Sequence, residues 1–225
     1  MAIIHPIKLG FVNCYLVESD NHYILVDAGN PNKEEALWRF LETKKISPSA
    51  IGLIIITHGH MDHVGSLKAI KEKTQAPVLI HESEGVLLQS GRTPGVHITI
   101  GWLSKLIRME KGINVIPVTP DISINQDYPL NDYGIDGKVI PTPGHTAGSL
   151  TVIIEGRHAI VGDIAMKIPL LSRSSYEPIV ADDIDQVYRS WQKIIDLGVQ
   201  TIYPAHGSIV GAEVLKELIT KRGKR

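Results

Sequence analysis

The stretch ITHGHMDHVG, Ile56 to Gly65, places three histidines and one aspartate within six consecutive positions. Imidazole nitrogens and carboxylate oxygens are the side-chain atoms that zinc, iron, manganese and cobalt accept as ligands. In the turn His58-Gly59-His60 the two imidazoles can point to the same side, whereas Asp62 and His63 follow where the chain enters a helix and can face a second point. One turn can therefore serve two metal ions about 3.5–4 Å apart.

Three more candidate ligands lie in loops that follow predicted strands: His145 in PTPGHTAGS, Asp163 after Val161-Gly162, and His206 in PAHG. Ligand sites in α/β folds form where strands end, so these loops can converge with the first motif although they are far apart in the sequence. Burying several imidazoles and a carboxylate without a cation would leave costly unpaired polar groups. The sequence therefore predicts a metal site. The other histidines are interpreted as ordinary core or surface side chains: His5, His22, His81, His97 and His158.

The elements that must position these residues are strands that alternate with helices. The β-branched run 53–56 predicts a buried strand directly before the histidines, and residues 15–17 and 23–26 predict a β-hairpin. Residues 187–195 carry apolar side chains at helical spacing. This alternation predicts an α/β protein whose helices cover the faces of its sheets. No linker rich in Pro, Gly or Ser divides the sequence, so residues 1–225 are expected to form a single domain.

Residues 82–112 depart from this alternation. A stretch with two glycines and a proline, 91–95, interrupts them, and four residues beyond it follow helical spacing: Trp102, Leu103, Leu106 and Ile107. We interpret the segment as an insertion with an amphipathic helix, which forms either a lid or a surface helix packed on its own domain. Further apolar residues follow Asp163: Met166, Ile168, Leu170 and Leu171. Together the two sets form either an entrance for an acyl chain or a core or dimer contact.

Composition narrows the classes of partner. Lys and Arg number 23 against 24 Asp and Glu, so a net charge of −1 offers no field that would gather nucleic acid or an anionic membrane. The first residues lack the basic leader and cleavage site of a secretory signal, and the single cysteine, Cys14, suits a reducing compartment. We therefore expect a cytoplasmic protein that acts on a small molecule, with no nucleic-acid or membrane partner; a homodimer stays open.

The chain contains, in this order, VDAG with Asp27, THGHMDH, PTPGHTAGS, VGD and PAHG. In these motifs and in their order, the sequence resembles the metallo-β-lactamase fold superfamily. The resemblance implies a four-layer αβ/βα sandwich in which two mixed β-sheets are flanked by helices, with the site in a cleft along one edge. It also implies a ligand set: His58, His60 and His145 for the first metal, Asp62, His63 and His206 for the second, and Asp163 for both. Asp27 would support the motif loop without being a ligand.

Within the superfamily, this full ligand set resembles the glyoxalase II, lactonase and related thioesterase or esterase group. The resemblance implies hydrolysis of an ester, lactone or thioester by a hydroxide that bridges two divalent ions, for which zinc is expected and iron or manganese would also fit. Asp163 would bridge the ions and Asp62 is the candidate proton shuttle. Lactonase-like members often place a tyrosine near the metals, and Tyr176 is the candidate here; the alternative is an exposed loop tyrosine.

Other members of the superfamily give the competing interpretations. Antibiotic-cleaving members generally lack the bridging aspartate, and those that process tRNA usually add basic arms, so a β-lactamase-like or phosphoester-cleaving hydrolase is a secondary alternative. Glyoxalase II has a helical C-terminal region that binds glutathione, whereas this sequence ends soon after His206, which argues against glutathione thioesters. A second class is an oxidoreductase: persulfide dioxygenases resemble glyoxalase II but bind one iron through two histidines and an aspartate.

Overall fold

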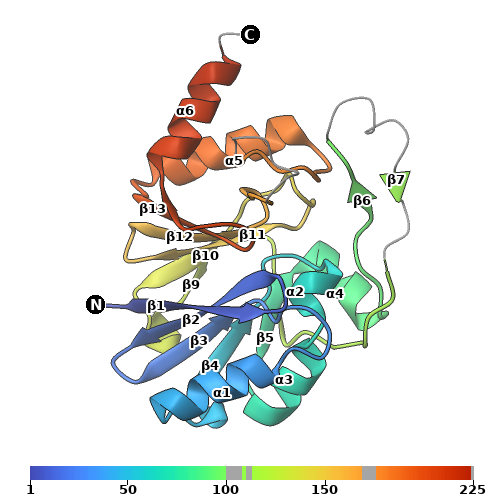
Figure 1. Cartoon of the computed structure of the whole chain (residues 1–225), viewed down its shortest axis with the longest axis vertical. Coiled ribbons are helices and arrows are strands. Elements are labelled where there is room, and N and C mark those ends of the chain that lie inside the picture. Colours follow the sequence, from blue (N-terminus) through green and yellow to red (C-terminus); the bar gives the residue numbers. More distant parts are fainter. Residues whose placement is uncertain (100–107, 110–112, 169–175, 224–225) are drawn as a thin grey trace.

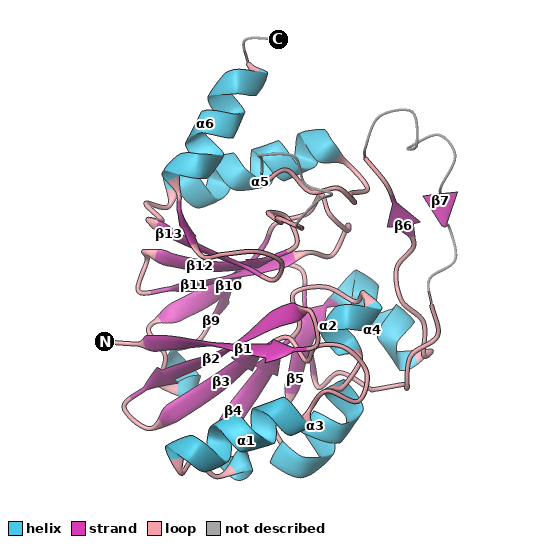
Figure 2. Cartoon of the chain, in the orientation of Figure 1, coloured by secondary structure: helices cyan, strands magenta, loops and turns pink. Residues whose placement is uncertain are grey.

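The computed structural model describes residues 1–99, 108–109, 113–168 and 176–223 of the chain. Two six-stranded β-sheets lie face to face, and helices cover their outer faces (Figures 1 and 2). This arrangement is the four-layer αβ/βα sandwich of two mixed sheets that the resemblance implied. Within the described ranges, no helix combines the length and the apolar character that crossing a bilayer requires.

The first sheet contains, in spatial order, β1 (Ile3–Leu9), β2 (Val12–Ser19), β3 (His22–Val26), β4 (Ile51–Ile55), β5 (Val78–His81) and β8 (Ile122–Ile124). The first three strands pair antiparallel and the others join in parallel. Helices α1 (Glu35–Lys44) and α3 (Leu67–Thr74) pack on the outer face, while α2 (Met61–Val64) and α4 (Glu82–Gln89) follow the carboxyl ends of β4 and β5 (Figure 1).

The second sheet contains β14 (Val210–Gly211), β13 (Thr201–Pro204), β12 (His158–Gly162), β11 (Leu150–Ile154), β10 (Gly137–Pro141) and β9 (Tyr128–Pro129). Only the β12 and β13 pair is parallel among these described strands. Helices α5 (Ile184–Asp196) and α6 (Glu213–Arg222) lie on the outer side of this sheet (Figure 2). Among the described residues, the connections also contain two short 3-10 helices, Pro48–Ala50 and Asn131–Tyr133.

Strand β4 shows why the run before the histidines is apolar at every position. Leu53 and Ile55 contribute to the core between the two sheets, whereas Ile54 and Ile56 contribute to the core between the first sheet and its helices. A parallel strand that is buried on both faces has no polar face, so its sequence cannot alternate. The rigid end of this strand is where the HxHxDH turn begins.

Local sequence also determines the turns and helix ends. Asp20 and Asn21 both adopt positive φ, 46° and 65°, and close the predicted hairpin between β2 and β3. Asp183 caps α5 by accepting a hydrogen bond from the backbone N–H of Gln186 at 2.9 Å. The buried indole of Trp191, on the inner face of this helix, donates to the carbonyl of Ile164 at 2.8 Å and so ties α5 to the segment after Asp163.

Residues 82–112 contain more regular structure than the sequence indicated. The first eight residues form α4, which packs on β5 and β8. Beyond it, β6 (Val96–His97) pairs antiparallel with β7 (Arg108–Met109) outside the two main sheets (Figure 1). The amphipathic helix expected over Trp102 to Ile107 lies outside the described residues, as do Leu170 and Leu171, so the lid interpretation stays a prediction.

Candidate metal centre

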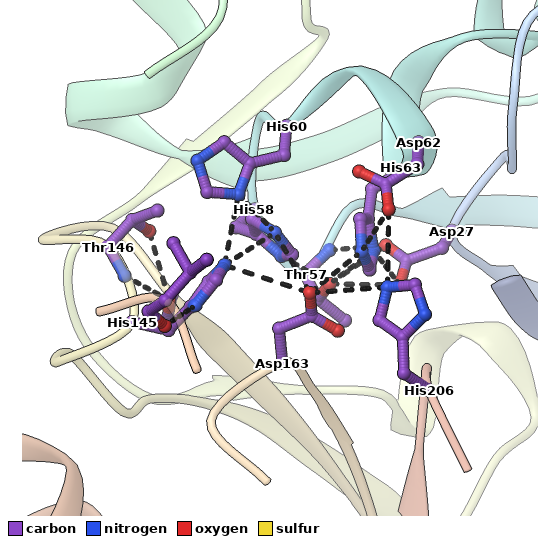
Figure 3. Close-up of polar contacts among 12 residues, drawn as sticks. Asp27, Thr57, His58, His60, Asp62, His63, His145, Thr146, Asp163 and His206 are labelled. Carbon is purple, nitrogen blue, oxygen red and sulfur yellow. Dashed lines mark hydrogen bonds and ion pairs between the residues drawn. The ribbon is translucent and has the colours of Figure 1, made fainter. Parts of the chain in front are cut away.

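Loops from both sheets bring the seven predicted ligands together (Figure 3). The HxHxDH turn follows β4, His145 lies between β10 and β11, Asp163 follows β12, and His206 follows β13. Their candidate ligand atoms form three overlapping groups in which all atoms lie within 4.8 Å of one another. The groups are His58, His60 and His145; His58, His63 and Asp163; and Asp62, His63 and His206.

The three histidines of the first group aim ring nitrogens at one point. His58 Nε2 lies 3.0 Å from His60 Nδ1, and His145 Nε2 lies 3.1 and 2.9 Å from these two atoms. The other nitrogens of His60 and His145 face carbonyl oxygens, those of Gly95 at 3.1 Å and Val180 at 2.7 Å. A carbonyl only accepts, so those nitrogens carry the protons and the inward nitrogens carry lone pairs.

The same assignment holds for His58. Its Nδ1 lies 3.2 Å from the hydroxyl of Thr57, which itself donates to the carboxylate of Asp27. The hydroxyl oxygen therefore accepts from His58 Nδ1–H, which leaves a lone pair on the inward Nε2. Three lone pairs that face one another at hydrogen-bond distance repel unless a cation lies between them. A divalent metal is the group that this arrangement fits.

Burial keeps these rings neutral and therefore able to bind a metal. Removal from water lowers the pKa of His58 well below its ordinary value and that of His145 to about 4. Asp163 responds in the opposite sense: burial raises its pKa, but His206 and His63 lower it more, so this carboxylate is ionised. The neutral imidazoles of the first group and the ionised carboxylate of Asp163 supply nitrogen and oxygen donors suited to a cation.

Asp163 lies between the two ends of the cluster (Figure 3). Its Oδ2 is 3.8 Å from His145 Nε2 on one side, and 3.5 and 3.4 Å from the Nε2 atoms of His63 and His206 on the other. Asp62 Oδ2 approaches the same His206 nitrogen at 3.2 Å. Among the described residues, Asp163 Oδ1 and His63 Nε2 are buried without a hydrogen-bond partner. Such orphaned atoms are expected where a ligand belongs.

Asp27 orients the motif turn, as the resemblance implied. Its carboxylate accepts from the backbone N–H of Thr57 at 2.8 Å and from Nδ1 of His63 at 2.9 Å. Burial lowers the pKa of His63, but the charges of Asp27, Asp163 and Asp62 raise it well above the usual range. Because Nδ1–H donates to Asp27, Nε2 is the nitrogen that His63 presents to the centre.

The His206 loop is positioned by two residues of β2 that sequence reasoning missed. The backbone N–H of Asn13 donates to Ala205 at 2.8 Å, its side-chain amide donates to Gly207 at 2.9 Å, and the Tyr15 hydroxyl donates to Pro204 at 2.7 Å. The available signal was an asparagine within the apolar run of residues 12–17, since a buried amide needs partners.

Glu84 is a third positioning residue that the sequence did not reveal. From α4, its buried carboxylate accepts from the backbone N–H groups of Gly59 and Gly148 and from the hydroxyl of Thr146. It therefore joins the loop of His58 and His60 to the loop of His145. Burial raises the pKa of Glu84 to about 7, although the three hydrogen bonds lower it. Glutamates in the first turn of a helix are commonly exposed and interact favourably with the helix dipole. Nothing in the sequence therefore distinguished Glu84 from such a surface residue.

Tyr176 is not brought into the cluster. Its side chain is buried, with 6% of its surface exposed, in the core between the second sheet and α5. Its hydroxyl donates to the carbonyl of Ser208 at 3.3 Å. The alternative of an exposed loop tyrosine is wrong, because tertiary packing covers the ring. The catalytic role of Tyr176 stays a prediction.

Comparisons with known proteins agree with this architecture. The sequence profile described as metallo-beta-lactamase superfamily matches residues 7–206. A beta-lactamase-like protein 2 homolog of Caenorhabditis elegans is 28% identical over 98% of this chain and 64% of its own length. The probable metallo-hydrolase YqgX of Bacillus subtilis is 28% identical over 68% of this chain and 65% of its own length. The chain thus spans less than two thirds of either relative.

A solved structure extends the likeness to the fold. The crystal structure of the BLEG-1 B3 metallo-beta-lactamase superposes with a TM-score of 0.71, at 21% identity, over 98% of this chain and all of that one. The profile match covers most of the chain and contains every residue of the cluster. The chain belongs to the metallo-beta-lactamase superfamily.

Proposed function

We propose that this protein is a hydrolase that holds two divalent ions, with zinc the expected metal, and cleaves an ester, lactone or thioester bond of a small molecule. The observation that carries the proposal is the placement of Asp163 between two complete donor groups. Iron and manganese accept the same nitrogen and oxygen ligands. The names of the metallo-hydrolase relatives support the reaction class.

Each residue of the cluster has a proposed role. His58, His60 and His145 would hold the first ion, Asp62, His63 and His206 the second, and Asp163 both. When bound, two such ions acidify water and polarise the oxygen of the bond to be cleaved. Asp62 is the best-placed proton carrier, because it lines the cavity above the cluster and its carboxylate has 20% of its surface exposed.

The charge state of Asp62 agrees with that role. Burial raises its pKa, but His63 and His206 lower it by more, so the carboxylate is ionised and has the unprotonated oxygen atoms that a proton carrier needs. The proton taken up from water can then pass to the leaving atom, which needs it after the bond has broken. His206 orients the carboxylate through the 3.2 Å contact with Oδ2.

The oxidoreductase alternative requires only two histidines and an aspartate around one iron. It leaves the group of Asp62, His63 and His206 without a function, although His63 and His206 are buried at considerable cost. The hydrolase proposal uses all seven side chains. Oxygen uptake by iron-loaded protein with a persulfide separates the two.

The test combines metal analysis with turnover. Protein stripped with a chelator is reloaded with zinc, manganese or iron, and acid release from esters, lactones and thioesters is followed with a pH indicator. We expect two ions per chain and metal-restored turnover, a loss of at least about 100-fold in His60→Ala, and no change in the control His22→Ala, whose side chain is exposed in β3. Turnover of no substrate with any metal, or a His60→Ala variant equal to wild type in both metal content and rate, would refute the proposal.

A further inference from the structure

Two cavities of different character meet at the cluster. The first, of about 250 Å³, is lined by five of the cluster's own side chains, namely His60, Asp62, His145, Asp163 and His206. The second, of about 630 Å³, is lined by His206 but by no other cluster residue. Phe11, Ile168 and His206 line both cavities. A molecule that extends through both therefore passes His206.

The first cavity is apolar beyond the cluster. Its walls include Met61, Val96, Ile113, Met166 and Ile179, and no Lys or Arg among the described residues lines it. Among the described lining residues, Thr93 is the one additional polar side chain, and it already pairs internally: the hydroxyl accepts from the N–H of Ile113 at 2.8 Å. A charged group in this cavity would lose its hydration without gaining a partner, which is costly. The cavity suits a neutral hydrocarbon group.

The second cavity carries positive charge instead. Lys8 and Lys167 both line it, both are exposed, and within the described part of the chain neither forms an ion pair. No carboxylate of a described residue lines this cavity. The amide of Asn13 faces it too, but that amide is engaged with the carbonyls of Gly207 and Pro204. Two lysines without counterions leave this end ready for an anion.

The position of Asp62 determines which part of a substrate lies at each end. Its carboxylate contacts His206, the cluster residue shared by the two cavities. Asp62 lines only the first cavity, but its contact with His206 places the leaving atom beside the residue that both cavities share. From there the leaving group can extend toward Lys8 and Lys167. The acyl group then extends the other way, into the apolar cavity.

Building on the proposed hydrolase function, we propose that the substrate is an amphipathic ester or thioester with a neutral apolar acyl group and an anionic leaving group. The apolar cavity has a volume of about 250 Å³. If each non-hydrogen atom with its hydrogens takes about 30 Å³, the volume of one water molecule in the liquid, the cavity holds roughly eight such atoms. In the reaction, the oxygen of water forms a bond to the acyl carbon and the bond to the leaving oxygen or sulfur breaks. The leaving atom takes one proton of that water, and a carboxylic acid is released.

Matched chromogenic esters test both halves of this inference. The acyl series is acetate, hexanoate and dodecanoate, with the mono-ester of hexanedioate as the charged counterpart of hexanoate. Each acyl group is joined to 4-nitrophenol or to its anionic 3-carboxy derivative. We expect kcat/KM to rise by about fourfold per methylene up to roughly eight carbons and then to level off. We expect a preference for the anionic leaving group and at least about tenfold slower cleavage of the hexanedioate.

Variants then assign the two ends to their residues. Replacing both lysines, Lys8→Gln with Lys167→Gln, should raise KM about fivefold for the anionic leaving group only. The control pair Lys44→Gln with Lys216→Gln changes the net charge equally at exposed helix positions. Ile113→Glu, at a side chain that is 45% exposed, should slow hexanoate more than acetate, by at least about tenfold. Its control is Val86→Glu, at a side chain that is 70% exposed.

A binding measurement keeps the inference separate from the hydrolase proposal. Calorimetry with the non-cleavable hexyl ether of the anionic phenol should show binding that weakens in the lysine double variant and in Ile113→Glu. If no ester, lactone or thioester is cleaved with any metal, the hydrolase proposal fails, and the binding measurement still tests whether the two cavities accept the apolar and the anionic group. Cleavage without dependence on acyl length or leaving-group charge would overturn the inference and leave the hydrolase standing. Faster cleavage of bis(4-nitrophenyl) phosphate than of every ester would overturn it as well.

Discussion

Replacing Asp27 with asparagine should disable one end of the cluster without removing any ligand. One carboxylate oxygen accepts from the N–H of Thr57 and the other from Nδ1 of His63. An asparagine has one oxygen, so its NH₂ group must face one of these donors. If it faces His63, the ring must expose its lone pair at Nδ1 and carry its proton on Nε2, which then points at the metal position.

Either orientation has a cost that can be estimated. A buried donor that faces another donor costs about 1–3 kcal/mol, and the site is closed to solvent, since Asp27 is 2% exposed and Thr57 1%. At about 2 kcal/mol, the melting temperature of a chain of this length falls by about 4–8 °C. Loss of a carboxylate partner behind a metal-binding histidine weakens metal affinity by about 10–100-fold. The weaker ion should be the one held by His63.

The assay measures zinc affinity by competition with a fluorescent chelator, together with thermal unfolding of metal-free protein. Asp20→Asn is the control, because Asp20 is exposed in a turn with φ of 46°, which asparagine also accepts. We expect the Asp27→Asn variant to keep one tight ion and lose affinity for the other. Two ions of wild-type affinity would refute the tautomer assignment, and an unchanged melting temperature would refute the buried-donor estimate.

Three further results are expected. Burial raises the pKa of Glu84 to about 7, so between the pKa of the unfolded chain and about pH 7 the folded state binds more protons than the unfolded state. The folded state therefore loses stability as the pH rises through this range. Glu84→Gln should flatten this part of the plot of melting temperature against pH for metal-free protein, and a plot identical to that of wild type would contradict the pKa assignment. Cys14, fully buried with its thiol pKa raised, should react with a disulfide reagent only after unfolding, as followed by absorbance. Zinc at about 100 times its dissociation constant should stabilise stripped protein by about 2.7 kcal/mol in calorimetry, and less than half of that should remain in His145→Ala.

The sequence was most informative where residues of metal-binding type directly follow a predicted strand. The HxHxDH turn follows an apolar strand, and the structure places that turn, His145, Asp163 and His206 together as the strand-end argument predicted. A resemblance carried by the same motifs gave the sandwich. These features are visible because each motif is local, and because few structural needs other than a cation gather so many imidazoles.

The remainder depended on tertiary contacts that leave little trace in local sequence. Glu84 acts through the backbone of Gly59 and Gly148, and any sequence presents a backbone N–H. Asn13 similarly contacts carbonyls almost two hundred residues away. Tyr176 follows Asp163 in the sequence, where the resemblance suggested a tyrosine near the metals, but packing places its ring in the core between the second sheet and α5. Proximity in sequence to a ligand is thus a poor guide to proximity in space.

The candidate ligands come from loops of both sheets, so the cluster can form only late in the synthesis of the chain. The turn from His58 to His63 leaves the ribosome first, and 143 residues separate His63 from His206. At about 5–20 residues per second, the last ligand follows after about 7–30 s. During that interval the nascent chain exposes an incomplete set of histidines that can capture an unsuitable ion. If the cluster binds metal as proposed, tight loading would await the docking of the second sheet, and a bound ion would then join the two sheets.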